Sequence, residues 1–231
     1  VALVLLLFTP CVLRAQDFII EKYQSSITVH KDSSFEVVEG LAVVFSRPRH
    51  GIYREIPYRY VDELGKTVRT PITVSSVTDD TGKSWKYRVQ RQGNVVNIRI
   101  GDPDVYVNGR QTYVIAYTVQ NAILFLPDHD ELYWNVTGNY WKAPIAEASA
   151  VVALDGVAGT EPITTACYTG FLGSHESACN AQKSGDGSTF YATRQLSAGE
   201  GLTISFGWPK GLVTPPPAWR QFLWSLDIGR N

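Results

Sequence analysis

Neither sign of charge is in surplus in this sequence, and methionine is absent from its 231 residues. The 21 Lys and Arg residues are matched by 22 Asp and Glu residues. This balance argues against a nucleic-acid partner, because such proteins need surplus basic charge to neutralise phosphates. Catalytic signatures are also missing: the chain contains no His-Glu-x-x-His, no Gly-x-Ser-x-Gly and no Gly-rich phosphate loop. We therefore expect no cofactor and no metal ion, and the sequence favours a protein that is not an enzyme.

Long apolar runs are lacking as well, apart from a short one at the start. Residues 1–15 are almost wholly apolar but too few to span a bilayer, and Pro10 interrupts them. Both features favour the hydrophobic region of a signal peptide, whose initiator and basic region we expect upstream. Ala15 is the small residue that signal peptidase prefers, which predicts a mature start near Gln16. The alternative is that this run forms a buried strand or helix of the domain.

Cysteine is scarce, with three residues in the chain. Cleavage before Gln16 removes Cys11 and leaves Cys167 and Cys179, and an even pair in an exported protein indicates a disulfide. Closing a loop of that length contributes about 3 kcal/mol in the chain-entropy model. The alternative, two free or metal-binding thiols, lacks further His or Cys residues at ligand spacing. The Gly- and Ser-rich stretch 167–188 is interpreted as a long exposed loop that this bridge staples.

What the sequence does contain is a repeated alternation of apolar and polar residues, without a sustained helical period. One clear run is interrupted by Glu39 and places these side chains on one strand face: Phe35, Val37, Leu41, Val43 and Phe45. Similar runs are separated by turn sequences such as Gln92-Gly93-Asn94 and Asn108-Gly109, which are typical of antiparallel hairpins. Residues 16–211 are therefore predicted to form an all-β domain, an antiparallel β-sandwich that is immunoglobulin-like in general architecture.

The composition changes after this domain. Residues 213–217 read Val-Thr-Pro-Pro-Pro, which predicts a stiff spacer. Trp219, Arg220, Phe222, Leu223 and Trp224 follow, and such residues are typical of a membrane interface. We therefore interpret residues 212–231 as a spacer and juxtamembrane segment and expect a transmembrane helix downstream. The alternative is a short helix that docks on the domain.

Two segments concentrate the polar and aromatic side chains that binding requires. The first, residues 47–59, is an arginine-rich loop whose candidate binding residues are Arg47, Arg49, His50, Tyr53 and Arg54. Guanidinium groups match carboxylate and phosphate geometry, so these side chains are candidates for an anion-binding surface. The alternative is that Arg54 and Arg59 pair with Glu55 or with distant carboxylates and cover the sheet.

The second segment, residues 128–141, is interpreted as an acidic and aromatic loop. Its candidate binding residues are Asp128, Asp130, Glu131 and Trp134. The acidic side chains are also candidates for calcium ligands, for a solvated turn, or for partners of the arginine-rich loop. Their spacing fits no EF-hand, and a glycosidase-like carboxylate pair is a further alternative. We expect the two loops to face or flank each other.

Several strings of residues, in this order along the chain, resemble one family. They lie at residues 27–29, 34–39, 50–57, 98–101, 113–117, 130–138, 141, 144–145 and 167–170. The most specific strings are Gly-Ile-Tyr-Arg at 51–54 and Leu-Tyr-Trp-Asn-Val-Thr-Gly at 132–138. Over most of the chain, from about Ile19 to Gly211, the sequence resembles the predicted-membrane-protein family called domain of unknown function 2207.

This resemblance implies an architecture and a location rather than an activity. Members of the family look like bacterial membrane proteins with a signal peptide, this ectodomain, membrane helices and often a low-complexity cytoplasmic tail. We therefore expect a cell-membrane protein whose β-sandwich lies on the extracytoplasmic side, periplasmic or at the cell surface. The predicted function is a non-catalytic binding or structural module with a protein or envelope-polymer partner. The alternative is a cell-envelope hydrolase or carbohydrate-active domain that uses the acidic residues 128–131.

Overall fold

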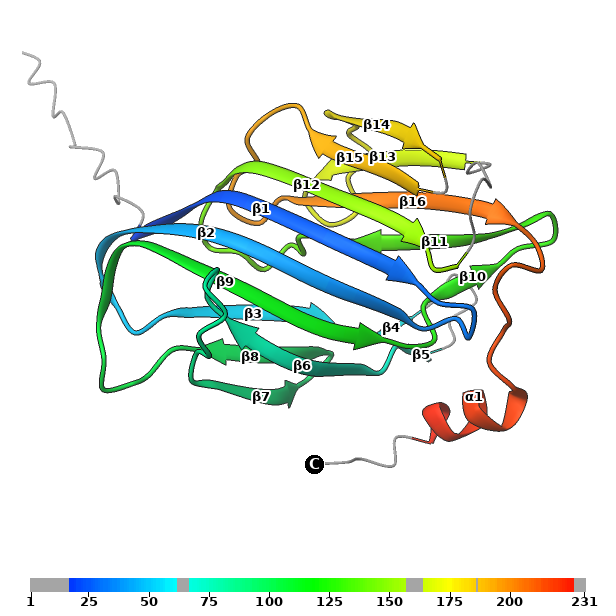
Figure 1. Cartoon of the computed structure of the whole chain (residues 1–231), viewed down its shortest axis with the longest axis horizontal. Coiled ribbons are helices and arrows are strands. Elements are labelled where there is room, and N and C mark those ends of the chain that lie inside the picture. The colour runs from blue at the N-terminus through cyan, green and yellow to red at the C-terminus, as the bar shows by residue number, and fades with distance from the viewer. Residues whose placement is uncertain (1–16, 62–66, 157–163, 186, 227–231) are drawn as a thin grey trace, which may run out of the picture.

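The alternating residues form long β-strands in the computed structural model, which describes residues 17–61, 67–156, 164–185 and 187–226. The predicted signal segment, residues 1–15, lies outside the described residues. Seven strands form the largest sheet, in the spatial order β14 (Cys179–Ser184), β15 (Gly187–Ala192), β12 (Ile145–Leu154), β1 (Phe18–Val29), β2 (Phe35–Arg49), β9 (Val107–Val119) and β6 (Ile72–Thr78). The prediction of an all-β fold is confirmed (Figure 1).

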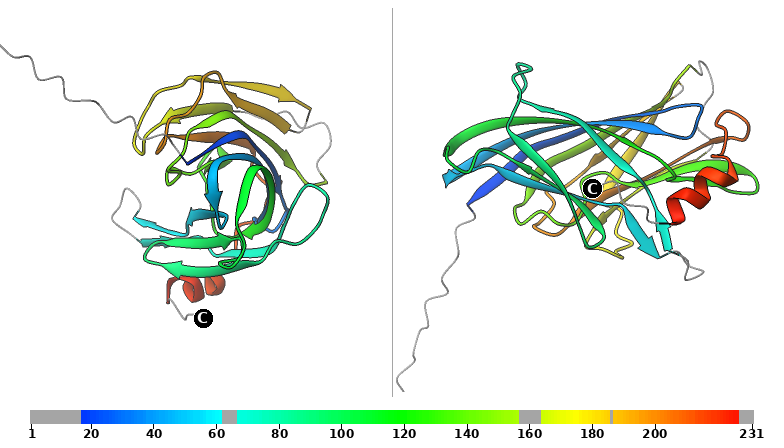
Figure 2. Two further views of the ribbon diagram at one scale, coloured as in Figure 1. Left: turned by 90° about the vertical axis from the view of Figure 1, so that its left-hand side faces the viewer. Right: turned by 90° about the horizontal axis from the view of Figure 1, so that it is seen from below.

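Three smaller sheets complete the fold. A four-stranded sheet has the order β10 (Ile123–Phe125), β11 (His129–Asn135), β16 (Gly201–Pro209) and β13 (Thr164–Gly170). A three-stranded sheet has the order β3 (Ile52–Pro57), β8 (Val95–Ile100) and β7 (Tyr87–Gln92), and β4 (Arg59–Val61) pairs with β5 (Thr67–Arg69). The long strands β1, β2 and β9 curve over the interior in both views of Figure 2.

One pairing departs from a purely antiparallel arrangement. Strand β1 pairs with β2 in the antiparallel sense but with β12 in the parallel sense, from Ile20 opposite Ile145 to Val29 opposite Leu154. Parallel neighbouring strands need a long connection between them. Here the connection from β1 to β12 contains the three-stranded sheet and strands β10 and β11, and the chain after β12 adds β13 and β16 to the four-stranded sheet. The seven-stranded sheet therefore brings residues more than a hundred positions apart side by side.

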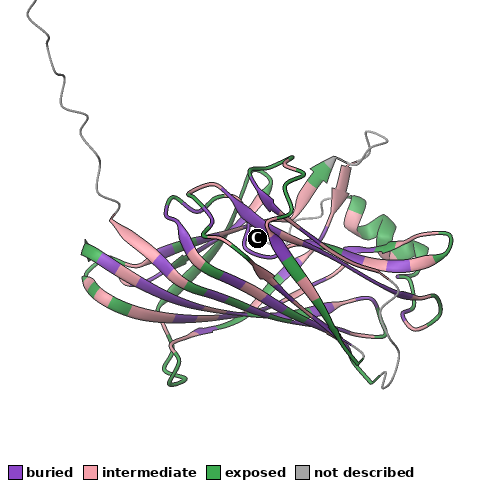
Figure 3. Cartoon of the chain, turned by 90° about the horizontal axis from the view of Figure 1, so that it is seen from above, coloured by how far each residue is buried: buried purple, intermediate pink, exposed green. Residues whose placement is uncertain are grey.

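The core lies where the smaller sheets pack against the seven-stranded sheet. The ring of Phe35 on β2 meets Trp134 on β11 edge to face at a centroid distance of 5.1 Å, and Tyr23 on β1 meets Trp141 at 6.3 Å. Such edge-to-face contacts stabilise the fold by more than the burial of their apolar area alone. Figure 3 shows the expected alternation of buried and exposed residues along these strands. Glu39 keeps this alternation: it points inward with its apolar neighbours and is buried.

Two local predictions are wrong. Asn108-Gly109 forms no hairpin turn but lies within β9, where Gly109 pairs with Phe45 next to a register shift. The stretch 167–188 is not a long loop, because it contains the end of β13, all of β14 and the start of β15. In both cases the Gly, Asn and Ser residues that suggested a loop are accommodated by irregular or edge strands.

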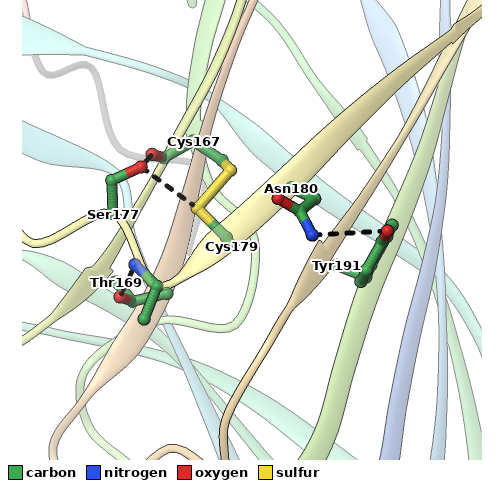
Figure 4. Close-up of a disulfide and its surroundings, with 7 residues drawn as sticks. Cys167, Thr169, Ser177, Cys179, Asn180 and Tyr191 are labelled. Atoms are coloured by element: carbon green, nitrogen blue, oxygen red, sulfur yellow. Dashed lines mark hydrogen bonds between the residues drawn. A yellow bond between two sulfur atoms is a disulfide. The ribbon is translucent and has the colours of Figure 1, made fainter.

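The disulfide is formed as predicted. Cys167 on β13 and Cys179 on β14 are bonded with their Cα atoms 6.1 Å apart, an ordinary span for such a bridge. Figure 4 shows the bond beside Ser177, whose hydroxyl donates to the carbonyl of Cys167 at 2.9 Å. Because β13 belongs to the four-stranded sheet and β14 to the seven-stranded sheet, the bond ties the two sheets together.

The C-terminal segment contains one helix, α1 (Ala218–Ser225). Ahead of it, Val213 is buried in the domain, and the backbone N–H of Thr214 donates to the carbonyl of Lys31 at 2.8 Å. Within the described residues, α1 is far shorter than a bilayer-spanning helix must be, and the structure provides no helix that qualifies.

Candidate functional site

The predicted acidic and aromatic loop contains strand β11, whose side chains lie on both faces of the four-stranded sheet. Residues 129–135 form a strand rather than a loop, so successive side chains point in opposite directions. Asp130 and Trp134 point into the core and are buried, whereas His129, Glu131 and Tyr133 point outward. The candidate residues in this segment therefore do not form one site.

The inward residues are engaged in the interior. Asp130 accepts a hydrogen bond from the ammonium group of Lys210 at 2.9 Å, and Lys210 also donates to the carbonyl of Leu126. Trp134 packs against Phe35, as described above. Neither side chain is presented to a ligand, and Asp130 cannot join Glu131 as a metal ligand because the two carboxylates lie on opposite faces.

The outward acidic residues share one imidazole ring. Nδ1 of His129 lies 2.9 Å from a carboxylate oxygen of Asp128, and Nε2 lies 3.4 Å from a carboxylate oxygen of Glu131. The hydrogen bond with Asp128, supported by Glu131, raises the pKa of His129 above its usual value. The same contact lowers the pKa of Asp128. This trio, the histidine cluster, therefore favours a proton on the ring beside a charged Asp128 carboxylate.

A pair of tyrosine rings lies on the same outer face. Tyr133 on β11 and Tyr168 on β13 have ring centroids 6.3 Å apart, although β16 runs between their strands. Ser205 of β16 is opposite Tyr133, points outward and is nevertheless only 7% exposed. We attribute this burial to the two rings leaning over β16. Tyr133 itself remains 49% exposed, so this tyrosine pair presents aromatic surface to solvent.

The histidine cluster and the tyrosine pair adjoin on one surface. Glu131 of β11 is paired with Gly207 of β16, which is paired in turn with Thr164 of β13. Glu131 lies two residues before Tyr133 and therefore on the same face of β11. A Cβ at Gly207 would lie 2.3 Å from the hydroxyl of Thr164 and 2.9 Å from the ring of His129, so a larger residue there would have to displace these side chains. The outer face therefore carries aromatic surface next to carboxylate and imidazole groups. Tyr168 was not among the candidates, although its outward position in a strand of alternating residues is the signal for it.

The arginine-rich segment is likewise divided between strands. Arg47 and Arg49 at the end of β2 are exposed and pair with Asp17, Arg47 at 3.8 Å and Arg49 more closely. The ring of His50 packs at a tilt against the ring of Tyr106, with a centroid distance of 4.0 Å. Tyr53 points outward from β3 and is 58% exposed. These residues lie at the end of the molecule where β1 begins and β2 ends, whereas β11 begins at the other end (Figure 1). The exposed residues of the two segments do not face each other, but the segments do meet in the interior, where Arg54 of the first contacts Val136 of the second.

Arg54 points inward from β3 into a buried cluster between the sheets. Its guanidinium donates to both carboxylate oxygens of Glu39, at 2.8 and 2.7 Å, and to the carbonyl of Val136 at 3.1 Å. The hydroxyl of Tyr117 donates to Glu39 at 2.6 Å, and that of Tyr23 donates to Val136 at 3.2 Å. Burial, together with the Glu39 charge, raises the pKa of Tyr117. The partner of Arg54 is a distant carboxylate, but the pair is internal instead of covering the sheet.

This interior cluster positions the turn after β11. Arg54 also donates to the backbone carbonyl of Glu55 at 2.9 Å, so the guanidinium links β2, β3 and the segment at Val136. Gly138 has a left-handed φ of +74°, and a Cβ there would lie 2.7 Å from Nη1 of Arg54. A buried, bidentate ion pair with these additional bonds holds three segments in one register.

The fold and the surface define an all-β domain in which Asp128, Asp130 and Glu131 each have a basic partner. The chain belongs to the family described as "Predicted membrane protein (DUF2207) N-terminal domain", whose model matches residues 19–208. A curated relative is the uncharacterized protein YciQ of Escherichia coli (strain K12), 28% identical over 167 residues. That match covers 72% of this chain but 26% of the relative, so the chain spans about a quarter of the relative's length.

Two of the solved structures with a similar fold come from one larger protein. The native yeast LTA4 hydrolase is 10% identical with a TM-score of 0.51, and the match covers 83% of this chain and 29% of that one. The same yeast hydrolase in complex with bestatin has a TM-score of 0.50 at 10% identity, with the same coverage. At this identity the likeness concerns the fold alone.

Proposed function

We propose that this chain is the extracytoplasmic part of a bacterial membrane protein and that it acts by binding rather than by catalysis. Three observations support the proposal: membership of a family described as predicted membrane proteins, a disulfide between Cys167 and Cys179, and the pairing of the acidic residues. Disulfides persist in the oxidising compartments outside the cytoplasm. We further propose that a transmembrane helix downstream of α1 links the domain to the membrane.

The alternative of a hydrolase receives no support from the acidic residues. A pair of catalytic carboxylates must flank one scissile bond from a shared cleft, roughly 5 to 10 Å apart. Asp130 is turned into the core towards Lys210, and Asp128 and Glu131 contact the same imidazole ring. The arrangement neutralises charge on a surface and does not leave a free acid and base.

The ligand that fits this surface is an envelope polysaccharide. The observation that carries the assignment is the contact of exposed Tyr133 with half-buried Tyr168 beside the histidine cluster. Sugar rings have an apolar C–H face, which stacks on aromatic rings, and a rim of hydroxyl groups, which bind carboxylates and imidazoles. Tyr133 supplies the stacking surface, and Asp128, His129 and Glu131 supply charged and polar partners. Tyrosine is also a residue that binding surfaces favour, because it loses little conformational freedom.

Sedimentation with purified insoluble peptidoglycan tests this assignment. We expect Tyr133→Ala and Tyr168→Ala each to weaken binding about fivefold, because an aromatic contact is worth about 1 kcal/mol. The matched control is Tyr53→Ala, which removes a tyrosine of similar exposure from the three-stranded sheet and should leave binding unchanged. Weakening by Tyr53→Ala alone would move the site to the arginine-rich segment. Binding to no polysaccharide, together with capture of a defined protein partner through Tyr133, would overturn the assignment.

The extracytoplasmic location has its own test. Trapping thiols by alkylation as cells are lysed, without reductant, should leave Cys167 and Cys179 unmodified, since both sulfurs are bonded. Reduction before alkylation should make both reactive, which provides the control. Modification of both residues without reductant would place the domain in a reducing compartment.

A further inference from the structure

Helix α1 carries an apolar stripe that the domain leaves uncovered. Trp219, Phe222, Leu223 and Leu226 follow the spacing i, i+3, i+4 and i+7, so they share one face of the helix and its last turn. All four are exposed, Phe222 by 61% and Leu223 by 47%. Every residue of α1 is at least partly exposed, whereas the alternating apolar residues of β1, β2 and β9 face the core.

Helix α1 lacks most of the local features that stabilise a helix in water. It has eight residues, no side-chain cap at its start, and neither acidic residues in its first turn nor basic residues in its last. Helices of this length are marginal in isolation, and their stability normally comes from packing of the apolar face. Hydrogen bonds tie the helix to its surroundings: Arg69 on β5 donates to the carbonyls of Trp224 and Ser225, and Gln221 donates to the carbonyl of Pro216 at 2.8 Å.

The composition around the stripe selects a lipid surface over another protein. Arg220 lies over the ring of Trp219 at 5.6 Å, and Arg69, which contacts the helix, is paired across β4 and β5 with Arg59. Two arginines, Arg220 and Arg69, therefore lie at a helix whose apolar stripe contains a tryptophan, and Arg59 is on the strand next to Arg69. Tryptophan is enriched at the headgroup level of membranes, and basic residues there attract anionic lipid. The family of this chain is described as a membrane protein.

We infer that α1 lies flat in the headgroup layer of an anionic bilayer, with its Trp219–Leu226 stripe towards the acyl chains, and thereby sets the orientation of the domain. Val213 and Thr214 fix the chain to the domain, and three prolines then lead into the helix. The helix is thus tied to the end that carries β4 and β5. Strands β13, β14 and β15 lie on the opposite side of the molecule from α1 in Figure 1 and in the left view of Figure 2, so they point away from this bilayer.

Vesicle flotation of the 231-residue chain tests the inference, and the chain offers a matched control. Phe222→Ser with Leu223→Ser removes a Phe-Leu pair from the stripe. Phe171→Ser with Leu172→Ser removes a pair of equal composition, 61% and 84% exposed, from the turn after β13. On vesicles containing phosphatidylglycerol we expect the α1 variant to lose at least fivefold in bound fraction and the control to bind like the unaltered chain. Any contribution from residues 1–15 is common to all three proteins.

Quenching of tryptophan fluorescence then measures how deeply α1 lies in the bilayer. Lipids brominated near the headgroup should quench Trp219 and Trp224 more strongly than lipids brominated near the end of the acyl chain, because a flat helix stays shallow. Equal binding by the α1 variant and the unaltered chain, or stronger quenching by the deep label, would overturn the inference. So would a loss of binding that is the same for both Phe-Leu variants. These outcomes are independent of the proposed polysaccharide site.

Discussion

Two charged clusters in this domain are built from similar residues and have opposite surroundings. Arg54 and Glu39 lie between the sheets, where both are buried, whereas His129 lies on the outer face of β11 between Asp128 and Glu131. Each cluster is positioned by a strand of alternating residues. The difference is only which face of the strand carries the charge. An inward charge becomes part of the architecture, because losing its partner leaves a desolvated ion, while an outward charge stays available for binding.

The largest expected effect is on the interior cluster. Arg54→Met removes the guanidinium but keeps an apolar side chain, so Glu39 loses two hydrogen bonds and its charge partner. Breaking one side of a buried pair costs about 3–5 kcal/mol. We expect that loss in the free energy of unfolding, measured by urea denaturation. The control is Arg110→Met, which removes the exposed partner of Glu21 and should cost less than about 1 kcal/mol.

A double variant tests whether the unpaired charge of Glu39 causes this loss of stability. Combining Glu39→Met with Arg54→Met removes the uncompensated carboxylate, so most of the lost stability should return. If the double variant remained as unstable as Arg54→Met, the cost would come from the lost bond to Val136 and not from the unpaired charge.

A smaller effect is expected at Gly138, whose backbone approaches the interior cluster. Gly138→Ala places a methyl group 2.7 Å from Nη1 of Arg54 in a left-handed conformation, and we expect a loss of about 2–3 kcal/mol. Gly93→Ala is the matched control, because Gly93 is also left-handed, at φ +59°, but its Cβ would meet nothing within 4 Å. The control isolates the backbone strain, about 1 kcal/mol. Equal losses at both positions would show that the approach to Arg54 is unimportant.

The smallest effect is expected at the histidine cluster, and it depends on pH. Because the folded state raises the pKa of His129, the stabilising contribution of its charged form is complete below the unfolded value of about 6.5 and is lost as pH rises through the folded value. For Asp128 the sign is opposite: its contribution is lost as pH falls through its lowered pKa. Subtracting the urea midpoints of His129→Gln from those of the unaltered protein between pH 5 and 9 isolates the histidine. A difference that grew with pH would contradict the assignment.

Much of the fold was predictable because it depends on local pattern. The run from Phe35 to Phe45 forms one strand face, and Cys167 is bonded to Cys179. Segments with weak alternation were not predictable in the same way. Asn108-Gly109 resembles a turn in isolation, but pairing with β2 holds it in a strand. Similarly, residues 128–141 were interpreted as a loop from their polar composition, although β16 pairs with seven of them.

The candidate sites were less predictable than the strands that carry them. The sequence by itself determined the all-β class, the strand faces and the disulfide, because side-chain alternation and cysteine pairing are properties of the chain. Only the tertiary structure decided that Glu39 meets Arg54, and that Tyr133 meets Tyr168 across β16. Such partners depend on strand order and register, which are set by the packing of whole sheets and leave no mark at the residues themselves.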